Sequence, residues 1–226
     1  MGIFEVFYAP GKLFESLPER KLAWILPYVL NIVLACLVSA LVFHYIGMEN
    51  ILRQQFEGTR MSPDQMEKII AQAASAPAWR NYLNAVIGSA LMYPFIALLI
   101  WVFALMATKD AKYGNQFSMV VYAYFPYQLI VTIMSAAILM AAPDPLQLDV
   151  RNLIASNAAV FLNKSEVSKS LYSLASSIDL LSFAEMFLLA LGFAKVNRSK
   201  FGYGLAGVLV LWVLYVSVKV ILSLLF

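Results

Sequence analysis

The two residues best placed to do chemistry are charges inside apolar stretches. Glu185 interrupts the stretch IDLLSFAEMFLLALGFAKV, and Lys219 interrupts GLAGVLVLWVLYVSVKVILSLLF. An ionised group at the centre of a membrane-spanning helix costs about 2.5–3.5 kcal/mol on insertion scales, so each charge needs a partner. In an antiparallel hairpin of these two stretches, Glu185 and Lys219 lie at a similar depth, which predicts a buried ion pair. The alternative is that Lys219 extends to the interface while Glu185 is protonated or faces a polar crevice.

The residue types of common catalytic and metal sites are scarce. His44 is the single histidine and Cys36 the single cysteine, so the chain cannot supply a histidine-rich or cysteine-rich metal site. Gly202, Gly204 and Gly207 spell G-x-G-x-x-G, but a dinucleotide site needs a strand before this motif. We expect these glycines to let the chain turn and the last two helices approach closely. The sequence therefore predicts no enzymatic activity, no cofactor and no metal.

A second polar feature is the stretch YAYFPYQL, which begins at Tyr122. Pro126 lacks a backbone N–H and obstructs the carbonyl of Tyr122, so a helix here should kink and the freed carbonyl needs a donor. The local candidates are Tyr124, Tyr127 and Gln128, and a neighbouring helix is the alternative. Such hydroxyl and amide groups are tolerated in lipid only when they find partners inside the protein.

Tyr93 and Pro94 repeat this pattern in the stretch MYPFI. Two kinked helices lined with tyrosine hydroxyls would form a crevice for a lipid or a small amphiphile. The alternative is a kink that serves packing, with the tyrosines at the membrane interface.

Composition indicates which elements carry these residues. Only 13% of the 226 residues are charged and the mean hydropathy is +0.77, whereas soluble domains have about 25% charged residues. The windows 22–48, 81–108 and 113–143 contain no charged residue, and each is long enough for a helix to cross about 30 Å of hydrocarbon. Long uninterrupted apolar runs favour helices over a β-barrel.

We therefore predict an all-α polytopic membrane protein, a bundle of five transmembrane helices in a single domain, residues 1–226. The spans are expected at about 22–46, 81–108, 117–142, 178–196 and 204–226. Lys and Arg are densest in the N-terminal tail and in the short connections 109–117 and 195–203, which places the N-terminus in the cytoplasm and the C-terminus outside. Because the basic residues are scattered between apolar segments, no nucleic acid is expected as a partner.

The two long connections are expected to hold short amphipathic helices on the outer side. Between 47 and 80, Ser62 is a helix cap, Pro63 takes the first helical position and Gln65 completes a capping box. Between 144 and 177, apolar residues fall on one face of each of two helices: Leu146, Val150, Leu153, Ile154 and Phe161, then Val167, Leu171, Leu174 and Ile178. Such helices would lie on the membrane surface or cap the bundle.

The N-terminal segment, residues 1–21, combines aromatic and basic residues. Phe4, Phe7, Tyr8 and Phe14 surround Pro10, and lysine and arginine follow. This pattern predicts an interfacial segment whose rings lie among lipid headgroups and whose basic residues face anionic lipid. The alternative is a segment that docks a partner.

Three stretches, taken in their order along the chain, resemble the Yip family of membrane proteins, the Yip-one domain in its compact bacterial form. They are FYAPGKLFESL before the first span, YAYFPYQL preceded by Gly114 and Ser118, and DLLSFAEMFLLALGFAKVNRSKFGYGLAG. The resemblance implies an all-helical fold of five spans with a cytoplasmic N-terminus. It also implies a non-enzymatic role in membrane organisation, as a scaffold that binds partners or itself.

The resemblance bears on partners and location as well. Eukaryotic members bind Rab-type GTPases, but this chain lacks their long N-terminal region and has Tyr8-Ala9-Pro10 where they have Tyr-Gly-Pro, so such a partner is not expected. Membrane lipids, other membrane proteins or a second copy of the chain are the expected partners, in a bacterial inner membrane. The alternative function is a transporter or lipid-handling protein that uses the crevice beside Pro94 and Pro126.

Overall fold

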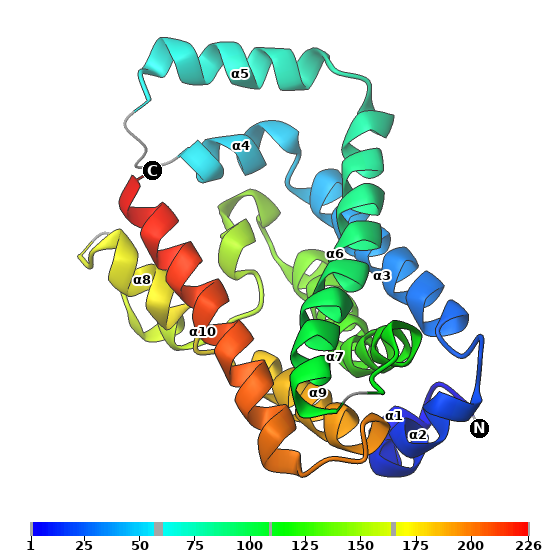
Figure 1. Ribbon diagram of the computed structural model, residues 1–226. Helices are drawn as coiled ribbons and strands as arrows, with labels where there is room; N and C mark the ends of the chain where they lie inside the picture. Colours follow the sequence, from blue (N-terminus) through cyan, green and yellow to red (C-terminus); the bar gives the residue numbers. More distant parts are fainter. Residues whose placement is uncertain (1, 57–60, 109, 164–165, 226) are drawn as a thin grey trace.

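A computed structural model describes residues 2–56, 61–108, 110–163 and 166–225 (Figure 1). Across these residues the fold is all-helical, with no strand beyond an isolated bridge between Asn157 and Asp179. The α-helices are α1 (Glu5–Tyr8), α2 (Pro10–Ser16), α3 (Ile25–Tyr45), α4 (Met48–Phe56), α5 (Pro63–Ser75), α6 (Ala78–Ala107), α7 (Tyr113–Ala141), α8 (Lys169–Ala175), α9 (Leu180–Val196) and α10 (Phe201–Leu225). Met1, Lys109 and Phe226, which belong to predicted segments, lie outside the described residues.

Counted over the described residues, four helices are long and apolar enough to cross a membrane. They cover Ile25–Tyr45, Trp79–Ala107, Tyr113–Ala141 and Phe201–Leu224. The predicted all-α membrane fold is confirmed to this extent. The remaining predicted span, 178–196, forms α9, whose 17 residues measure about 25 Å at 1.5 Å per residue. This length falls short of the hydrocarbon core, which is about 30 Å thick.

α7 is the helix around which the others are arranged. α3, α6 and α9 pack against it, and the N-terminal helix α1 contacts it as well. The first half of α7 is buried without interruption from Gln116 to Ala123. Such burial on all sides is expected for a helix whose apolar residues point in every direction. α7 is therefore the common partner of the helices that form the main core.

The two ends of the bundle carry different segments (Figure 1). α1, α2 and the turn between α9 and α10 lie at one end, where Glu15 and Lys195 approach to 3.5 Å. α4, α5 and the last turn of α10 lie at the other end. The basic turn after α9 thus shares an end with the N-terminal tail, which is the grouping that the charge distribution predicts.

Pro94 lies inside α6 without ending the helix. Because proline has no N–H, the Ala90 carbonyl loses its helical donor. Tyr28 of α3 supplies the replacement, since its hydroxyl donates to the Ala90 oxygen at 2.8 Å. A neighbouring helix therefore satisfies the backbone group that the proline frees.

α3 also reaches α7 beside its own proline, Pro126. The Asn31 side-chain amide, which is fully buried, donates to the Val121 carbonyl at 2.8 Å. This oxygen is one residue before the Tyr122 carbonyl that Pro126 leaves without its helical donor. α3 thus makes a polar contact next to the Tyr122 carbonyl, and the donor predicted for that carbonyl itself stays a prediction.

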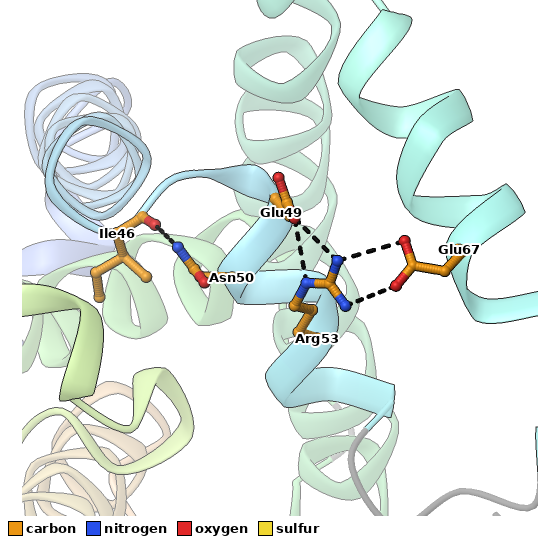
Figure 2. A network of polar contacts seen from close by, with 5 residues as sticks. All are labelled: Ile46, Glu49, Asn50, Arg53 and Glu67. Carbon is orange, nitrogen blue, oxygen red and sulfur yellow. Dashed lines mark hydrogen bonds and ion pairs between the residues drawn. The ribbon is translucent and has the colours of Figure 1, made fainter. Parts of the chain in front are cut away.

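α4 and α5 form the first long connection, and Figure 2 shows the contact that joins them. Arg53 of α4 lies 3.0 Å from Glu49 and 2.8 Å from Glu67 of α5. Hydrogen bonds to Glu67 and then to Glu49 raise the pKa of Arg53. The Asn50 amide donates to the Ile46 carbonyl at 3.0 Å and so ties the start of α4 to the end of α3. Because the ion pairs are solvent-exposed, they orient these helices more than they stabilise the fold.

The capping box predicted at the start of α5 is confirmed. The Ser62 hydroxyl oxygen accepts the Gln65 backbone N–H at 3.3 Å, and the Gln65 side-chain oxygen accepts the Ser62 N–H at 3.3 Å. Pro63 is the first residue of the helix, where its missing N–H carries no cost.

The helix predicted over 146–161 is wrong. This part of the chain forms 3-10 turns at Pro145–Gln147, Val150–Asn152 and Ala158–Phe161. Before each turn the side chain of Asp144, Asp149 or Asn157 accepts the backbone N–H two residues ahead. Such local bonds compete with a helical ladder and start a new turn each time. The next predicted helix is present but shorter, as α8.

The N-terminal tail has a buried and an exposed face. Phe4, Phe7 and Tyr8 are exposed, as an interfacial segment would require. Phe14 is fully buried, so its predicted interfacial position is wrong. Its ring lies against α9 at Gly192, where an added Cβ would come within 3.3 Å of it. The absence of a side chain on Gly192 is what lets α2 dock on α9.

The glycines of FGYGLAG lie inside α10 and allow close contacts between helices. A Cβ on Gly204 would lie 2.4 Å from the Ala190 carbonyl oxygen, and one on Gly207 would lie 2.4 Å from the Phe103 ring. The expected close approach of the last two helices is therefore confirmed. The turn between them uses a different residue, Arg198, whose backbone is left-handed with φ +49°.

We expect Gly204→Ala to lower the free energy of unfolding by about 1–3 kcal/mol, because the new methyl group would meet a backbone oxygen that has no freedom to rotate. Gly202→Ala is the matched control. Nothing lies within 4 Å of its Cβ position, and alanine favours a helix interior over glycine by about 0.5–1 kcal/mol. Thermal unfolding in detergent measures both variants, and equal effects would contradict the close contact of α9 with α10.

Tyr28→Phe should lower the free energy of unfolding by about 0.6 kcal/mol, the average for a hydrogen bond inside a membrane protein. In a Pro94→Ala background the Ala90 carbonyl regains a backbone donor, so the same substitution should cost less. Unfolding by titration with dodecyl sulfate measures the four proteins. Tyr8→Phe, at an exposed tyrosine, is the control. An undiminished loss in the Pro94→Ala background would contradict the role assigned to Tyr28.

Candidate functional site

α9 begins at an aspartate whose carboxylate is held by several donors. Asp179 accepts the Ser182 backbone N–H at 2.9 Å and the Ser182 hydroxyl at 2.8 Å. The Ser156 hydroxyl donates to the same carboxylate, and the Leu180 N–H donates to the Ser156 carbonyl at 3.1 Å. These contacts set the start of α9 and with it the face on which Glu185 lies.

Glu185 lies partly buried on α9, and α9 packs on α7. Its carboxyl group interacts with the Tyr124 hydroxyl of α7. The carboxyl group also interacts electrostatically with the hydroxyls of Tyr93 and Tyr127 and with the Asp179 carboxylate. Within the part of the chain that the structure describes, these partners include no cation.

Tyrosine rings from three helices pack on one another in a series that includes Tyr124. Tyr93 of α6 packs edge-to-face on Tyr124, with ring centroids 5.4 Å apart, and on Tyr28 of α3 at 6.3 Å. Tyr93 is fully buried, and its hydroxyl has no hydrogen-bond partner among the described residues. We refer to Tyr28, Tyr93, Tyr124, Tyr127 and Glu185 as the tyrosine–glutamate cluster.

The predicted ion pair between Glu185 and Lys219 is not formed. The Lys219 ammonium donates to the hydroxyls of Ser176 at 2.8 Å and Ser177 at 3.1 Å, just after α8. The two serine hydroxyls in turn donate to the Ser173 carbonyl, both at 2.9 Å. Because α8 packs against α10, the two serine hydroxyls that follow α8 lie within hydrogen-bond distance of the lysine.

The other residues predicted on the proline-containing helices occupy the interior of the bundle or its edge. Tyr122 and Pro126 are buried on α7, whereas Pro94 and Gln128 are half-buried. Two hollows of the described residues lie elsewhere, one among α6, α9 and α10 and one between α8 and α10, and neither Tyr93 nor Tyr124 lines them. The crevice beside the two prolines therefore stays a prediction.

The predicted interfacial residues form a separate aromatic group. The Phe4 and Phe7 ring centroids lie 6.0 and 6.1 Å from that of Phe125 on α7. Pro10 is the first residue of α2, and Tyr8 is the most exposed of the tail aromatics. This group connects the tail to α7 and presents its outer side to the surroundings.

Polar contacts that the sequence reasoning missed join the same helices. The Gln116 amide nitrogen donates to Asn197 Oδ1 at 2.7 Å, and Asn197 Nδ2 donates back to Gln116 Oε1 at 3.3 Å. This pair links the start of α7 to the end of α9, and Asn31 links α3 to α7. A signal was available, because Asn31 and Gln116 are amides inside windows that contain no charged residue.

The cluster offers one carboxyl group and several phenolic hydroxyls, which can hold a proton and exchange hydrogen bonds. No group of three or more His, Cys, Asp or Glu residues that could hold a metal ion occurs in the described ranges. Comparison with known proteins found no match, either to a family model, to a curated protein or to a solved structure. The site is therefore interpreted from its own geometry.

The effects of Glu185→Gln and Lys219→Met on the free energy of unfolding should add to within about 0.5 kcal/mol, because the two side chains have separate partners. Combining Lys219→Met with Ser176→Ala should instead show coupling of about 0.5–3 kcal/mol, as expected for groups in contact. Reversible unfolding in detergent measures both cycles. Strong coupling in the first cycle would mean that the ion pair forms after all.

Proposed function

We propose that this chain is a Yip-like, non-enzymatic integral membrane protein that organises the membrane as a self-associating or partner-binding scaffold. The observation that carries the proposal is one contact among three segments. A Cβ on Gly192 would come within 2.6 Å of the Met119 side chain and 3.3 Å of the Phe14 ring. Phe14 and Gly192 belong to two of the stretches that resemble the family, and Met119 directly follows Ser118, which is part of the third pattern. The segments behind the resemblance thus meet in a common packing core.

The packing of this core favours a structural role. Met119 and Phe14 are fully buried, and the polar side chains nearby bind other parts of the protein. Asn31 binds the backbone of α7, and Gln116 binds Asn197 at the end of α9. Side chains that bind one another hold helices in place, whereas a transport path needs groups free to bind a solute.

We propose further that α9 is a fifth, short span, with the N-terminus in the cytoplasm and the C-terminus outside a bacterial inner membrane. Its support is the apolar composition of α9 and its position between α7 and α10. A bilayer accommodates a short span by local thinning at modest cost. In this arrangement α4 and α5 lie on the outer surface and the tail on the inner one.

The partners in this proposal are membrane lipids and a second copy of the chain or another membrane protein. The exposed Phe4, Phe7 and Tyr8 suit the headgroup region, and Lys12 beside them suits anionic lipid. Rab-type GTPases and nucleic acids are not part of the proposal.

A lipid-handling function is the second candidate, and one observation favours it. An open groove of about 500 Å³ lies between α8 and α10, with apolar walls that include Leu171, Leu174, Val216 and Val220. An apolar groove beside a membrane-spanning helix, here α10, suits an acyl chain.

The two functions are distinguished in nanodiscs prepared from native lipid extracts. Single-molecule photobleaching counts the copies in each disc, and native mass spectrometry identifies lipids and proteins that stay bound. The scaffold proposal predicts two or more copies, or a copurifying membrane protein, and no change on filling the groove with Leu174→Trp. The control is Leu209→Trp, at an exposed position of α10 outside the groove.

A monomer that retains one lipid, and loses it in Leu174→Trp but not in Leu209→Trp, would replace the scaffold proposal with the lipid-handling one. A monomer surrounded by bulk lipid alone would contradict both.

A further inference from the structure

We propose that the groove between α8 and α10 binds an anionic phospholipid, whose phosphate lies at Lys219 and whose acyl chain lies along the apolar walls. The proposal rests on the lipid-handling candidate for the groove, and it adds the class of lipid and the residue that recognises it. A bound lipid is compatible with a scaffold as well, because the groove lies within a single chain. Three features of α8 and α10 lead to it.

The first feature is the way in which two serine hydroxyls orient the Lys219 ammonium. Lys219 Nζ donates to Ser176 Oγ at 2.8 Å and to Ser177 Oγ at 3.1 Å. Both hydroxyls donate in turn to the Ser173 carbonyl oxygen at 2.9 Å, so their hydrogens are engaged and their oxygens accept from the lysine. An ammonium has three N–H groups. The third has no acceptor among the described residues, so a ligand oxygen can accept from it.

The second feature is a positive charge without an anion. Lys219 lies half-buried on α10, a helix long and apolar enough to cross a membrane, where an unpaired charge is costly. Its serine partners are neutral, and Lys219 makes no ion pair within the described ranges. The Asp179 carboxylate, which follows the two serines in the sequence, is held by Ser156 and Ser182. A phosphate would supply the missing negative charge, and lysine binds phosphate as a point charge.

The third feature is the groove itself. Its volume of about 500 Å³ lies within the range of about 300–1,000 Å³ that is typical of small-molecule sites. The lining is mainly apolar, and Ser170 of α8 and Ser217 of α10 are its polar members. Because the groove is open, it can hold one chain of a lipid while the headgroup and the second chain stay outside.

The charge and the apolar walls belong to the same pair of helices. Lys219 lies three residues after Val216 and directly before Val220, and residues three apart on a helix are neighbours. Ser176 lies two residues after Leu174, which lines the groove from α8. A ligand that reaches the lysine and also fills the groove needs an anion joined to an apolar chain. An anionic phospholipid has this chemistry and is present in the bilayer around α10.

Native mass spectrometry of the full chain in nanodiscs tests the proposal. The discs contain equal amounts of phosphatidylglycerol and phosphatidylcholine with the same acyl chains. We expect each chain to retain one phosphatidylglycerol in about fivefold excess over phosphatidylcholine, the preference that one lysine gives toward anionic lipid. The quaternary ammonium of phosphatidylcholine neutralises its own phosphate, so this lipid offers Lys219 no net charge.

Variants separate the headgroup from the acyl chain. Lys219→Met should abolish the excess while a lipid stays in the groove, and Lys219→Arg should preserve the excess, which a merely structural role would not predict. Leu174→Trp should release both lipids, because it fills the groove. The matched controls are Lys200→Met, at an exposed lysine just before α10, and Leu209→Trp, outside the groove. Both should leave the excess unchanged.

Two results would overturn the proposal. Equal retention of the two lipids by the wild-type chain, or an excess that persists in Lys219→Met, would show that Lys219 does not recognise the headgroup. A free fatty acid retained in place of a phospholipid would likewise exclude the proposed ligand. If Lys219→Met does not fold, the ratio of the two lipids on the wild-type chain and their loss in Leu174→Trp still decide.

These outcomes are distinct from those of the proposed functions. A lipid that stays in the groove without a headgroup preference would support lipid handling and contradict recognition by Lys219. The number of copies in each disc, counted by photobleaching, tests the scaffold alone.

Discussion

The structure depends on the rule that polar groups in hydrocarbon must be satisfied by the protein itself. α6 shows how strictly the rule applies. Pro94 deprives the Ala90 carbonyl of its helical donor, and the Tyr28 hydroxyl of α3 donates to that carbonyl oxygen at 2.8 Å in its place. The bond fixes the height of α3 against α6. The missing backbone donor in α6 thereby gives rise to a hydrogen bond that positions α3 and α6 relative to each other.

The same rule explains why α7 is central. Asn31 brings α3 to its Val121 carbonyl, and Gln116 brings the end of α9 to its first turns. Apolar packing supplies most of the stability but has little directional preference. Hydrogen bonds supply direction, and these two end on α7. Gly192 and Gly204 then let α2 and α10 approach the assembly closely.

Local patterns in the sequence predicted the elements well, since both the charge-free windows and the Ser62 capping box depend on neighbouring residues. Side-chain partners that are far apart in the sequence were harder to predict. The pairing of Glu185 with Lys219 followed from equal depth in a hairpin, but depth says nothing about α8, whose following serines lie nearer to the lysine. The connection before α8 was misjudged because its apolar spacing fits a helix, while Asp144 and Asp149 bind the backbone and interrupt it.

Glu185 is an interior charge that this rule leaves with little compensation. The lysine has serine oxygens and Asp179 has three donors, whereas the groups that interact with Glu185 in the described structure are tyrosine hydroxyls and a like charge. A glutamine would fill the same space without the liability of a charge. A carboxyl group at this position of α9 therefore carries a cost that Lys219 and Lys195 do not offset, because each of them binds elsewhere.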